Sequence, residues 1–318
     1  LYGYAVALSD DTLFVSSPSA DIPTLNAGMV YAYQNSGMGW GGEQLLDIHT
    51  TMPAPDATVD DYGFSLAFDE QNDMVYVGGP DTTIPKTGQK RGAVFAWTKD
   101  INGAWTFQNA QSYGLVADAH VGAALDVDNG NLVIGAPTHD YQFDTFEGEG
   151  LVISRNISAD ASISSEHIVG SIVQRDGQSN GSAVAISGDL LAVGAPNIGS
   201  STPALGEVSI YRRLTGDPSK WRRVDTFVAD SERTGFGTSL AWVGDVLLVS
   251  EPKDFSARLY VIAPDPNKPG SWLDPDRFNR PRNDAGDHAA ISSDGNRVLL
   301  GDAFDQDSTT IEFFEYNA

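Results

Sequence analysis

The side chains best suited to binding a ligand lie together in one acidic and aromatic stretch, THDYQFDTFEGEG at residues 138–150. The candidates there are His139, Asp140, Tyr141, Phe143 and Asp144. An aromatic ring can stack on the apolar face of a sugar, while carboxylates accept hydrogen bonds from its hydroxyl groups. We therefore expect this loop to bind a ligand. A merely solvated loop, or a metal ion held by Asp140 and Asp144, is the alternative.

Further carboxylates are expected at the same site. Other loops that follow a buried apolar run are also rich in acids and turn-forming residues, and we expect them to share one rim of the fold. Their candidates are Asp21, Asp81, Asp254, Asp302 and Asp305. Because binding residues usually lie on loops that a rigid scaffold supports, these carboxylates are predicted to take part in binding.

The residue patterns of common enzymes are missing from the sequence. There is no cysteine, and none of the five histidines forms an H-x-x-x-H or H-E-x-x-H pair. No G-x-S-x-G turn and no phosphate-binding loop is present. We expect no enzymatic activity. A pair of Asp or Glu side chains acting on a glycosidic bond, in a carbohydrate-active enzyme, is the catalytic alternative.

An internal repeat reveals the elements that must position these loops. An apolar run that ends in a turn recurs six times, about 60 residues apart. Its copies are DTLFVSSP (11–18), DMVYVGGP (73–80), GNLVIGAP (130–137), GDLLAVGAP (188–196), GDVLLVSEP (244–252) and GNRVLLGDA (295–303). A Gly-x-x-apolar phrase precedes each copy, and a third apolar phrase follows it. Four repeats add a segment with a tryptophan, which we interpret as a packing residue: Trp40, Trp105, Trp221 and Trp272.

Each phrase has the features of a β-strand. The runs are short, rich in Val, Leu, Ile and aromatic residues, and bounded by Gly, Pro, Asp or Ser. Turns such as SGD and DNGN between the first two phrases suit tight hairpins. No stretch shows a sustained helical period. The unit is therefore predicted to be a four-stranded antiparallel meander, although the third repeat lacks the tryptophan and leaves its fourth strand unassigned.

Burial explains why such a unit is repeated. One small sheet cannot cover both of its faces, whereas several sheets packed around an axis bury one another. We therefore predict an all-β fold, a β-propeller with six visible repeats, and seven blades as the alternative. We expect a single propeller domain over residues 1–318, as an excerpt of a longer chain. Its blades are placed at about 1–60, 61–119, 120–178, 179–233, 234–284 and 285–318.

The phrases TGFGTSLAWVGDVLLVSEP and NGSAVAISGDLLAVGAP resemble the FG-GAP repeat of integrin α-type β-propellers, and the resemblance covers essentially the whole chain. Propellers of that family serve in adhesion and in the recognition of matrix or glycans, often as one domain of a larger protein. The resemblance thus implies an extracellular interaction module. A structural subunit that packs through its propeller in an extracellular assembly is the alternative.

The resemblance also implies calcium, which such propellers bind in some blades through a hairpin with the pattern D-x-D-x-D-G-x-x-D. The nearest match is DVDNGN, with Asp126, Asp128 and Asn129 as candidate ligands. The hairpins here are shorter than the family pattern, and Ca²⁺ takes six to eight oxygen ligands. We therefore expect no required cofactor, with Ca²⁺ at this degenerate hairpin as the alternative.

The net charge of −24 limits the class of partner. Nucleic acid is disfavoured because its phosphates would be repelled, and no apolar run is long enough for direct membrane insertion as a helix. Two N-x-S/T sequons, at Asn156 and Asn180, are candidate glycosylation sites. We expect a secreted or cell-surface protein. Its predicted partners are a protein or glycan ligand, copies of itself or neighbouring domains of the same chain.

Overall fold

The structure is a computed structural model that describes most of the chain. The described residues are 2–21, 27–51, 58–83, 88–111, 117–138, 151–157, 163–169, 179–196, 205–232, 235–253, 256–278, 289–293, 297–302 and 311–315. Within them the protein is all-β apart from one short helix, α1 (Ile48–Thr51). The fold class is a β-propeller of antiparallel sheets, which confirms the prediction from the repeat.

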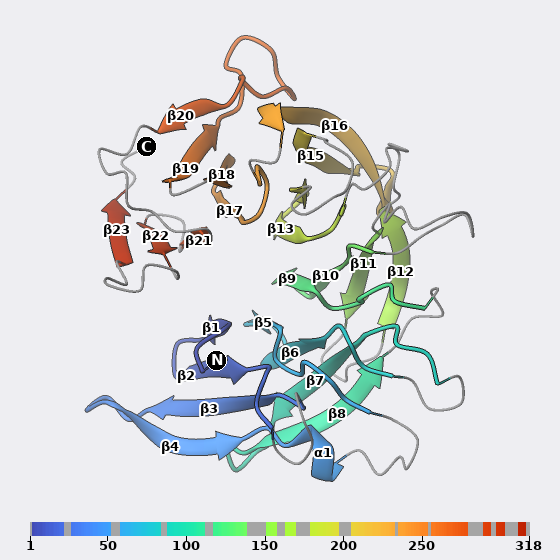
Figure 1. The fold of residues 1–318 in the computed structure, drawn as a ribbon, viewed down its shortest axis with the longest axis vertical. Helices are drawn as coiled ribbons and strands as arrows, with labels where there is room; N and C mark the ends of the chain where they lie inside the picture. The colour runs from blue at the N-terminus through green and yellow to red at the C-terminus, as the bar shows by residue number, and fades with distance from the viewer. Residues whose placement is uncertain are drawn as a thin grey trace. The chain divides into compact units, whose positions relative to one another are not determined.

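The chain divides into two compact units. Unit 1 (Leu1–Asp144 and Gly150–Gly170) contains three four-stranded sheets, each an antiparallel meander in sequence order (Figure 1). Its strands are β1 (Val6–Leu8), β2 (Thr12–Ser17), β3 (Met29–Asn35), β4 (Trp40–Leu45), β5 (Ser65–Asp69), β6 (Met74–Gly79), β7 (Ala93–Lys99), β8 (Trp105–Gln111), β9 (Ala124–Asp128), β10 (Asn131–Ala136), β11 (Leu151–Ile157) and β12 (Ile163–Val169).

Unit 2 (Thr145–Glu149 and Ser171–Ala318) contains two four-stranded meanders and one sheet with three strands among its described residues. Its strands are β13 (Ala183–Ser187), β14 (Leu190–Ala195), β15 (Leu205–Leu214), β16 (Asp217–Glu232), β17 (Leu240–Val243), β18 (Val246–Lys253), β19 (Ser256–Ile262), β20 (Asp276–Phe278), β21 (Ala289–Ser293), β22 (Arg297–Asp302) and β23 (Ile311–Glu315).

Glycine determines how closely neighbouring sheets approach in unit 1. Gly28 and Gly92 open the third phrase of the first two repeats, and they form parallel bridges to Tyr62 and Val121, which lie before the first strand of the next sheet. A Cβ atom at either glycine would collide with the backbone of its partner, and both glycines have positive φ. This close approach explains why the third phrase begins with glycine in the sequence.

The sheets of unit 1 bury both faces of the middle sheet, as the burial argument predicts. Val75 and Phe95 pack in one cluster with Phe14 and Val30 of the first sheet. On the opposite face of the same strands, Tyr76 lies in a second cluster with residues of the third sheet, among them Leu132 and Ile134. Because side chains alternate between the two faces along β6 and β7, successive residues pack against two different neighbouring sheets.

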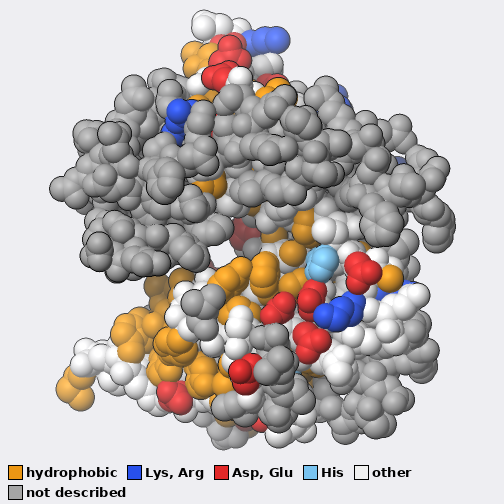
Figure 2. Space-filling view, viewed as in Figure 1, with side chains coloured by type: hydrophobic (Ala, Val, Ile, Leu, Met, Phe, Trp, Pro, Cys, Tyr) orange, Lys and Arg blue, Asp and Glu red, His pale blue; other side chains and the backbone are white. Residues whose placement is uncertain are grey.

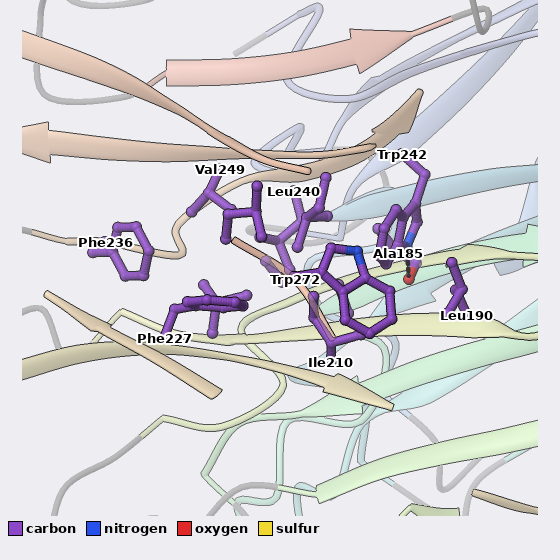
Figure 3. Close-up of a cluster of buried hydrophobic side chains, with 14 of the residues drawn as sticks. Ala185, Leu190, Ile210, Phe227, Phe236, Leu240, Trp242, Val249 and Trp272 are labelled. Atoms are coloured by element: carbon purple, nitrogen blue, oxygen red, sulfur yellow. Dashed lines mark hydrogen bonds between the residues drawn. The ribbon is translucent and has the colours of Figure 1, made fainter. Parts of the chain in front are cut away.

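In unit 2 the main core lies between the sheets β13–β16 and β17–β20 (Figure 3). The indole N–H of Trp242 donates a hydrogen bond to the carbonyl oxygen of Ala185 at 3.0 Å, which ties β17 to β13. Trp272 is buried in this core, and Trp105 is buried in unit 1, in line with the packing interpretation. Trp40 differs, because 47% of its surface is exposed.

The third repeat has a fourth strand after all. This strand, β12, pairs antiparallel with β11. Its sequence, ISSEHIV, contains no tryptophan and few apolar residues. The tryptophan pattern that marks the fourth strand in other repeats therefore could not predict this strand.

Candidate functional site

The described residues place five ionisable side chains together on one face of unit 1. These are Asp60, Asp61, Asp81, Lys90 and His120, which we call the rim cluster. They come from three connections, β4–β5, β6–β7 and β8–β9, and the β6–β7 connection is a loop of the kind predicted to lie on the rim. Figure 2 shows acidic side chains gathered around a basic side chain and a histidine on this face.

Backbone hydrogen bonds join the three connections that carry the rim cluster. The amide of Thr83 donates to the carbonyl oxygen of Thr58 at 2.8 Å, and the amide of Val121 donates to that of Arg91 at 3.0 Å. These bonds link the segment before β5 to the β6–β7 connection, and that connection to the segment before β9. The side chains of the rim cluster are therefore positioned by paired backbone.

Asp81 is the central residue of the rim cluster. Its Oδ1 lies 3.0 Å from Nε2 of His120, and its Oδ2 lies 3.3 Å from Nζ of Lys90. Lys90 Nζ also lies 3.9 Å from Oδ2 of Asp60. All of these side chains are partly exposed, so a ligand can reach them from solvent.

Asp61 differs from its neighbours because its carboxylate makes no hydrogen bond or ion pair with any described residue. Burial raises the pKa of this carboxyl, and the nearby charges of Asp81 and Asp60 raise it further, whereas Lys90 and His120 act in the opposite direction. A partly buried carboxylate without a partner among the described residues is an acceptor available to a ligand.

An exposed aromatic ring lies close to Asp61. Burial and the charge of Asp61 both raise the pKa of the Tyr4 phenol, and 47% of the Tyr4 surface remains exposed. The Tyr4 ring contacts Phe64, with ring centroids 5.1 Å apart. The structure thus brings an aromatic ring and carboxylates together, the combination that the sequence predicted for the 138–150 loop.

Two members of the rim cluster have an unusual backbone conformation. Asp61 and His120 have φ values of 56° and 51°, in the left-handed region that glycine favours. Each opens the same turn, in which its carbonyl oxygen accepts from the amide three residues later, Phe64 or Ala123. In the fifth repeat Gly235 opens this turn with φ 72°. A side chain at this position is therefore strained relative to glycine, which is typical of functional sites.

The structure describes only some of the predicted binding residues. Asp81 lies in the rim cluster, and Asp21 is exposed after β2. Asp302 ends β22, but its side chain is outside the described part. The remaining candidates all lie outside the described residues: His139, Asp140, Tyr141, Phe143, Asp144, Asp254 and Asp305.

Sequence reasoning missed most of the rim cluster, naming only Asp81. The signal that could have found Asp61 and His120 is their alignment with Gly235, because a charged residue then stands where another repeat has glycine. The only sequence signal for Lys90 is that basic residues are few in this acidic chain.

The hairpin proposed for calcium is a tight turn whose polar groups bind one another. Asn129 and Gly130 have positive φ and join β9 to β10. The Asn129 amide donates to Oδ1 of Asp128 at 2.8 Å, and Oδ1 of Asp126 accepts from the amide of Val127 at 2.9 Å. Two carboxylates are fewer than the ligands Ca²⁺ takes, and the described residues contain no group of three acidic or histidine ligands. Calcium here stays a prediction.

The two sequons lie in different settings. Asn156 is in β11, and its side chain is outside the described part. Asn180 is partly buried at the position where Tyr62 and Phe236 are buried in other repeats. Glycosylation at either residue stays a prediction.

No helix in the described part is long and apolar enough to span a membrane. No protein-family model matches the sequence, and no curated protein sequence matches it. Solved structures match it in fold, among them that of a "putative 6-phosphogluconolactonase from Bacteroides uniformis ATCC 8492". That chain is 12% identical, with a TM-score of 0.62 over 99% of this chain and 81% of its own. At such identity the likeness shows the fold alone.

Proposed function

We propose that the chain is an interaction module of the cell surface or extracellular space, and that its rim cluster binds a glycan of the matrix or of another cell. The observation that carries this proposal is the partly buried carboxylate of Asp61, which has no partner among the described residues and lies beside the exposed ring of Tyr4. Adhesion is the role implied by the resemblance of the repeats to FG-GAP propellers.

The chemistry of the rim cluster suits a polyhydroxylated ligand. Asp60 and Asp61 accept hydrogen bonds from sugar hydroxyl groups, and Lys90 donates them. Tyr4 offers an apolar ring face to the C–H groups of a sugar ring. Because three carboxylates outnumber the single lysine, a neutral or basic glycan suits the cluster better than a strongly anionic one.

A glycan array tests this proposal. Wild-type protein is expected to bind a defined set of glycans, and Asp81→Asn is expected to abolish that binding because it weakens the contacts to both His120 and Lys90. Asp10→Asn, an exposed change in the β1–β2 turn, is the control and should bind normally. No glycan bound by the wild type, or full binding by Asp81→Asn, would overturn the proposal.

The same array run with calcium and with a chelator tests the metal prediction. We propose that binding needs no cofactor, so the chelator should leave the signals unchanged. Loss of binding with the chelator, restored by added Ca²⁺, would show that a metal ion takes part.

A carbohydrate-active enzyme is the second candidate function, favoured by the fold likeness to the phosphogluconolactonase-named structure. Two of the three carboxyl groups of Asp60, Asp61 and Asp81 would supply its carboxylate pair. This candidate predicts that glycans selected on the array, or sugar lactones, are hydrolysed by the wild type and not by Asp61→Asn. Intact ligands after prolonged incubation favour the binding module instead.

A further inference from the structure

The His120 ring connects three segments of unit 1 through its two nitrogen atoms. Nε2 lies 3.0 Å from Oδ1 of Asp81 in the β6–β7 connection, and Nδ1 hydrogen-bonds to the hydroxyl of Thr138 just after β10. The Thr138 hydroxyl in turn donates to the carbonyl oxygen of Asp118, in the segment before β9. One imidazole thus joins the β6–β7, β8–β9 and β10–β11 connections, and the first two carry members of the rim cluster.

The number of available protons determines which of these bonds can exist together. A threonine hydroxyl has one proton, and here it is donated to Asp118. Nδ1 must then donate to Thr138, and because the acidic Asp81 accepts from Nε2, both ring nitrogens carry protons. The complete set of three bonds therefore requires the imidazolium cation. In a neutral ring with its proton on Nε2, Nδ1 can only accept a hydrogen bond. The Thr138 hydroxyl would then donate to Nδ1, and the Asp118 carbonyl would lose that donor.

The surrounding charges act on the same ring. Asp81 faces it from the β6–β7 connection, and the charge of Asp61 in the β4–β5 connection interacts with it. Lys90 is the positive charge in this group, and it bonds the other oxygen of Asp81. The imidazolium is thus stabilised by the carboxylates of Asp81 and Asp61, and the ammonium group of Lys90 shares Asp81 with it.

We propose that His120 is a proton-controlled latch for the rim cluster: protonation holds the β6–β7, β8–β9 and β10–β11 connections together, and deprotonation releases Thr138 from Asp118. This inference rests on the proposed function for its consequence, which is that ligand binding is stronger in mildly acidic than in alkaline solution. Histidine is the side chain whose charge ordinarily changes between about pH 5 and 8.

Hydrogen exchange on the protein alone tests the latch without any ligand. The reporters are the amides of Asp118 and Val121, which donate to the carbonyl oxygens of Lys90 and Arg91. After correction for the intrinsic rate, their protection is expected to fall about five-fold between pH 5.5 and 8.0, the factor for one net hydrogen bond. His120→Gln should show no such change. Thr138→Val, which keeps the ring and the Asp81 contact, should show a smaller one. Equal pH dependence in wild type and His120→Gln would overturn the latch.

Nitrogen NMR of labelled histidine side chains gives an independent readout of the same group. Both ring nitrogens of His120 should carry protons at pH 5.5, and the resonance is assigned by its loss in His120→Gln. A neutral ring at pH 5.5 would also overturn the latch.

The glycan array at pH 5.5 and 8.0 then separates the two proposals. Stronger binding at pH 5.5 by wild type, but not by His120→Gln, supports both. No binding at either pH refutes the proposed function, while the exchange result still decides on the latch. Binding that is identical at both pH values refutes the link between latch and ligand.

Discussion

Two charged clusters, one in each unit, show how differently the same side-chain chemistry can be used. In unit 2, Glu251 is only 2% exposed, and its Oε2 accepts from Nη1 of Arg258 at 3.1 Å and from the hydroxyl of Tyr260 at 2.7 Å. In unit 1, Asp61 is partly exposed and has no such partner among the described residues. The buried carboxylate of Glu251 accepts hydrogen bonds from residues of its own sheet, which indicates a structural role. The rim carboxylate of Asp61 remains available to a ligand.

Individual turns of the two units also differ in the residue that opens them. In unit 2 the turn before β17 opens with Gly235, which adopts positive φ readily. In unit 1 the corresponding turns open with Asp61 and His120, which adopt it at a conformational cost. In the fourth repeat Ser179 opens the same turn. The turn therefore forms with serine or glycine, and the fold alone does not require the charged side chains of Asp61 and His120.

The largest expected effect is on the buried cluster. Glu251→Ala should destabilise the protein by about 3 kcal/mol, because Arg258 would be left without its partner, and Arg258 is itself only 25% exposed. Urea unfolding measures this loss. Glu70→Ala, at an exposed turn, is the control and should change stability by no more than about 0.5 kcal/mol. A similar small effect at Glu251 would show that the two clusters do not differ as described.

A smaller effect is expected from the turn position. Gly235→Ala should cost about 1 kcal/mol, because the new Cβ disfavours positive φ. His120→Gly makes the opposite change in unit 1. At pH 8, where the latch is released, it should leave stability within about 0.5 kcal/mol of wild type, since relief of strain offsets the greater freedom of the unfolded chain. Thermal unfolding measures both. A large loss in His120→Gly would instead assign the histidine a structural role.

The smallest expected effect concerns the pH dependence of stability. Because the pKa of Asp61 is raised in the folded state, folding favours its protonated form, and this contribution to stability is lost as pH rises from the ordinary Asp pKa through the raised value. Asp61→Asn removes the charge. The free energy of unfolding of the variant, relative to that of wild type, should therefore increase as pH rises, by no more than about 0.5 kcal/mol at pH 7. Unfolding curves at pH 3 and pH 7 measure the gain. The same change at the exposed Asp73 is the control. A gain at pH 3 rather than at pH 7 would contradict a raised pKa of Asp61 in the folded state.

Much of the fold could be predicted because it depends on local patterns. The apolar runs and the Asn-Gly type of turn follow directly from strand and turn rules, as at Gly130, whereas the sheet contact at Gly92 was found only in the structure. Strand β12 escaped prediction because its polar sequence lacks the marker residue of the other repeats.

The candidate site was harder to predict because it depends on contacts between distant segments. Lys90, Asp60 and His120 belong to three connections, and no local spacing relates them. Only the pairing of these connections, with Val121 bonded to Arg91, shows that the side chains meet. The aromatic partner was sought at Tyr141, whereas the described structure offers Tyr4 beside Asp61.

Ligand binding by the rim cluster is tested most directly by comparing Asp61→Gly with Asp73→Gly in calorimetric titrations of the glycan selected on the array. These two aspartates flank the same strand, β5, at opposite ends, and both have positive φ, at 56° and 52°. We predict that Asp61→Gly lowers affinity at least about ten-fold, or about 1.4 kcal/mol, without loss of thermal stability, and that Asp73→Gly changes neither. Unchanged affinity in Asp61→Gly, or an equal loss in both variants, would contradict a binding role for the rim cluster.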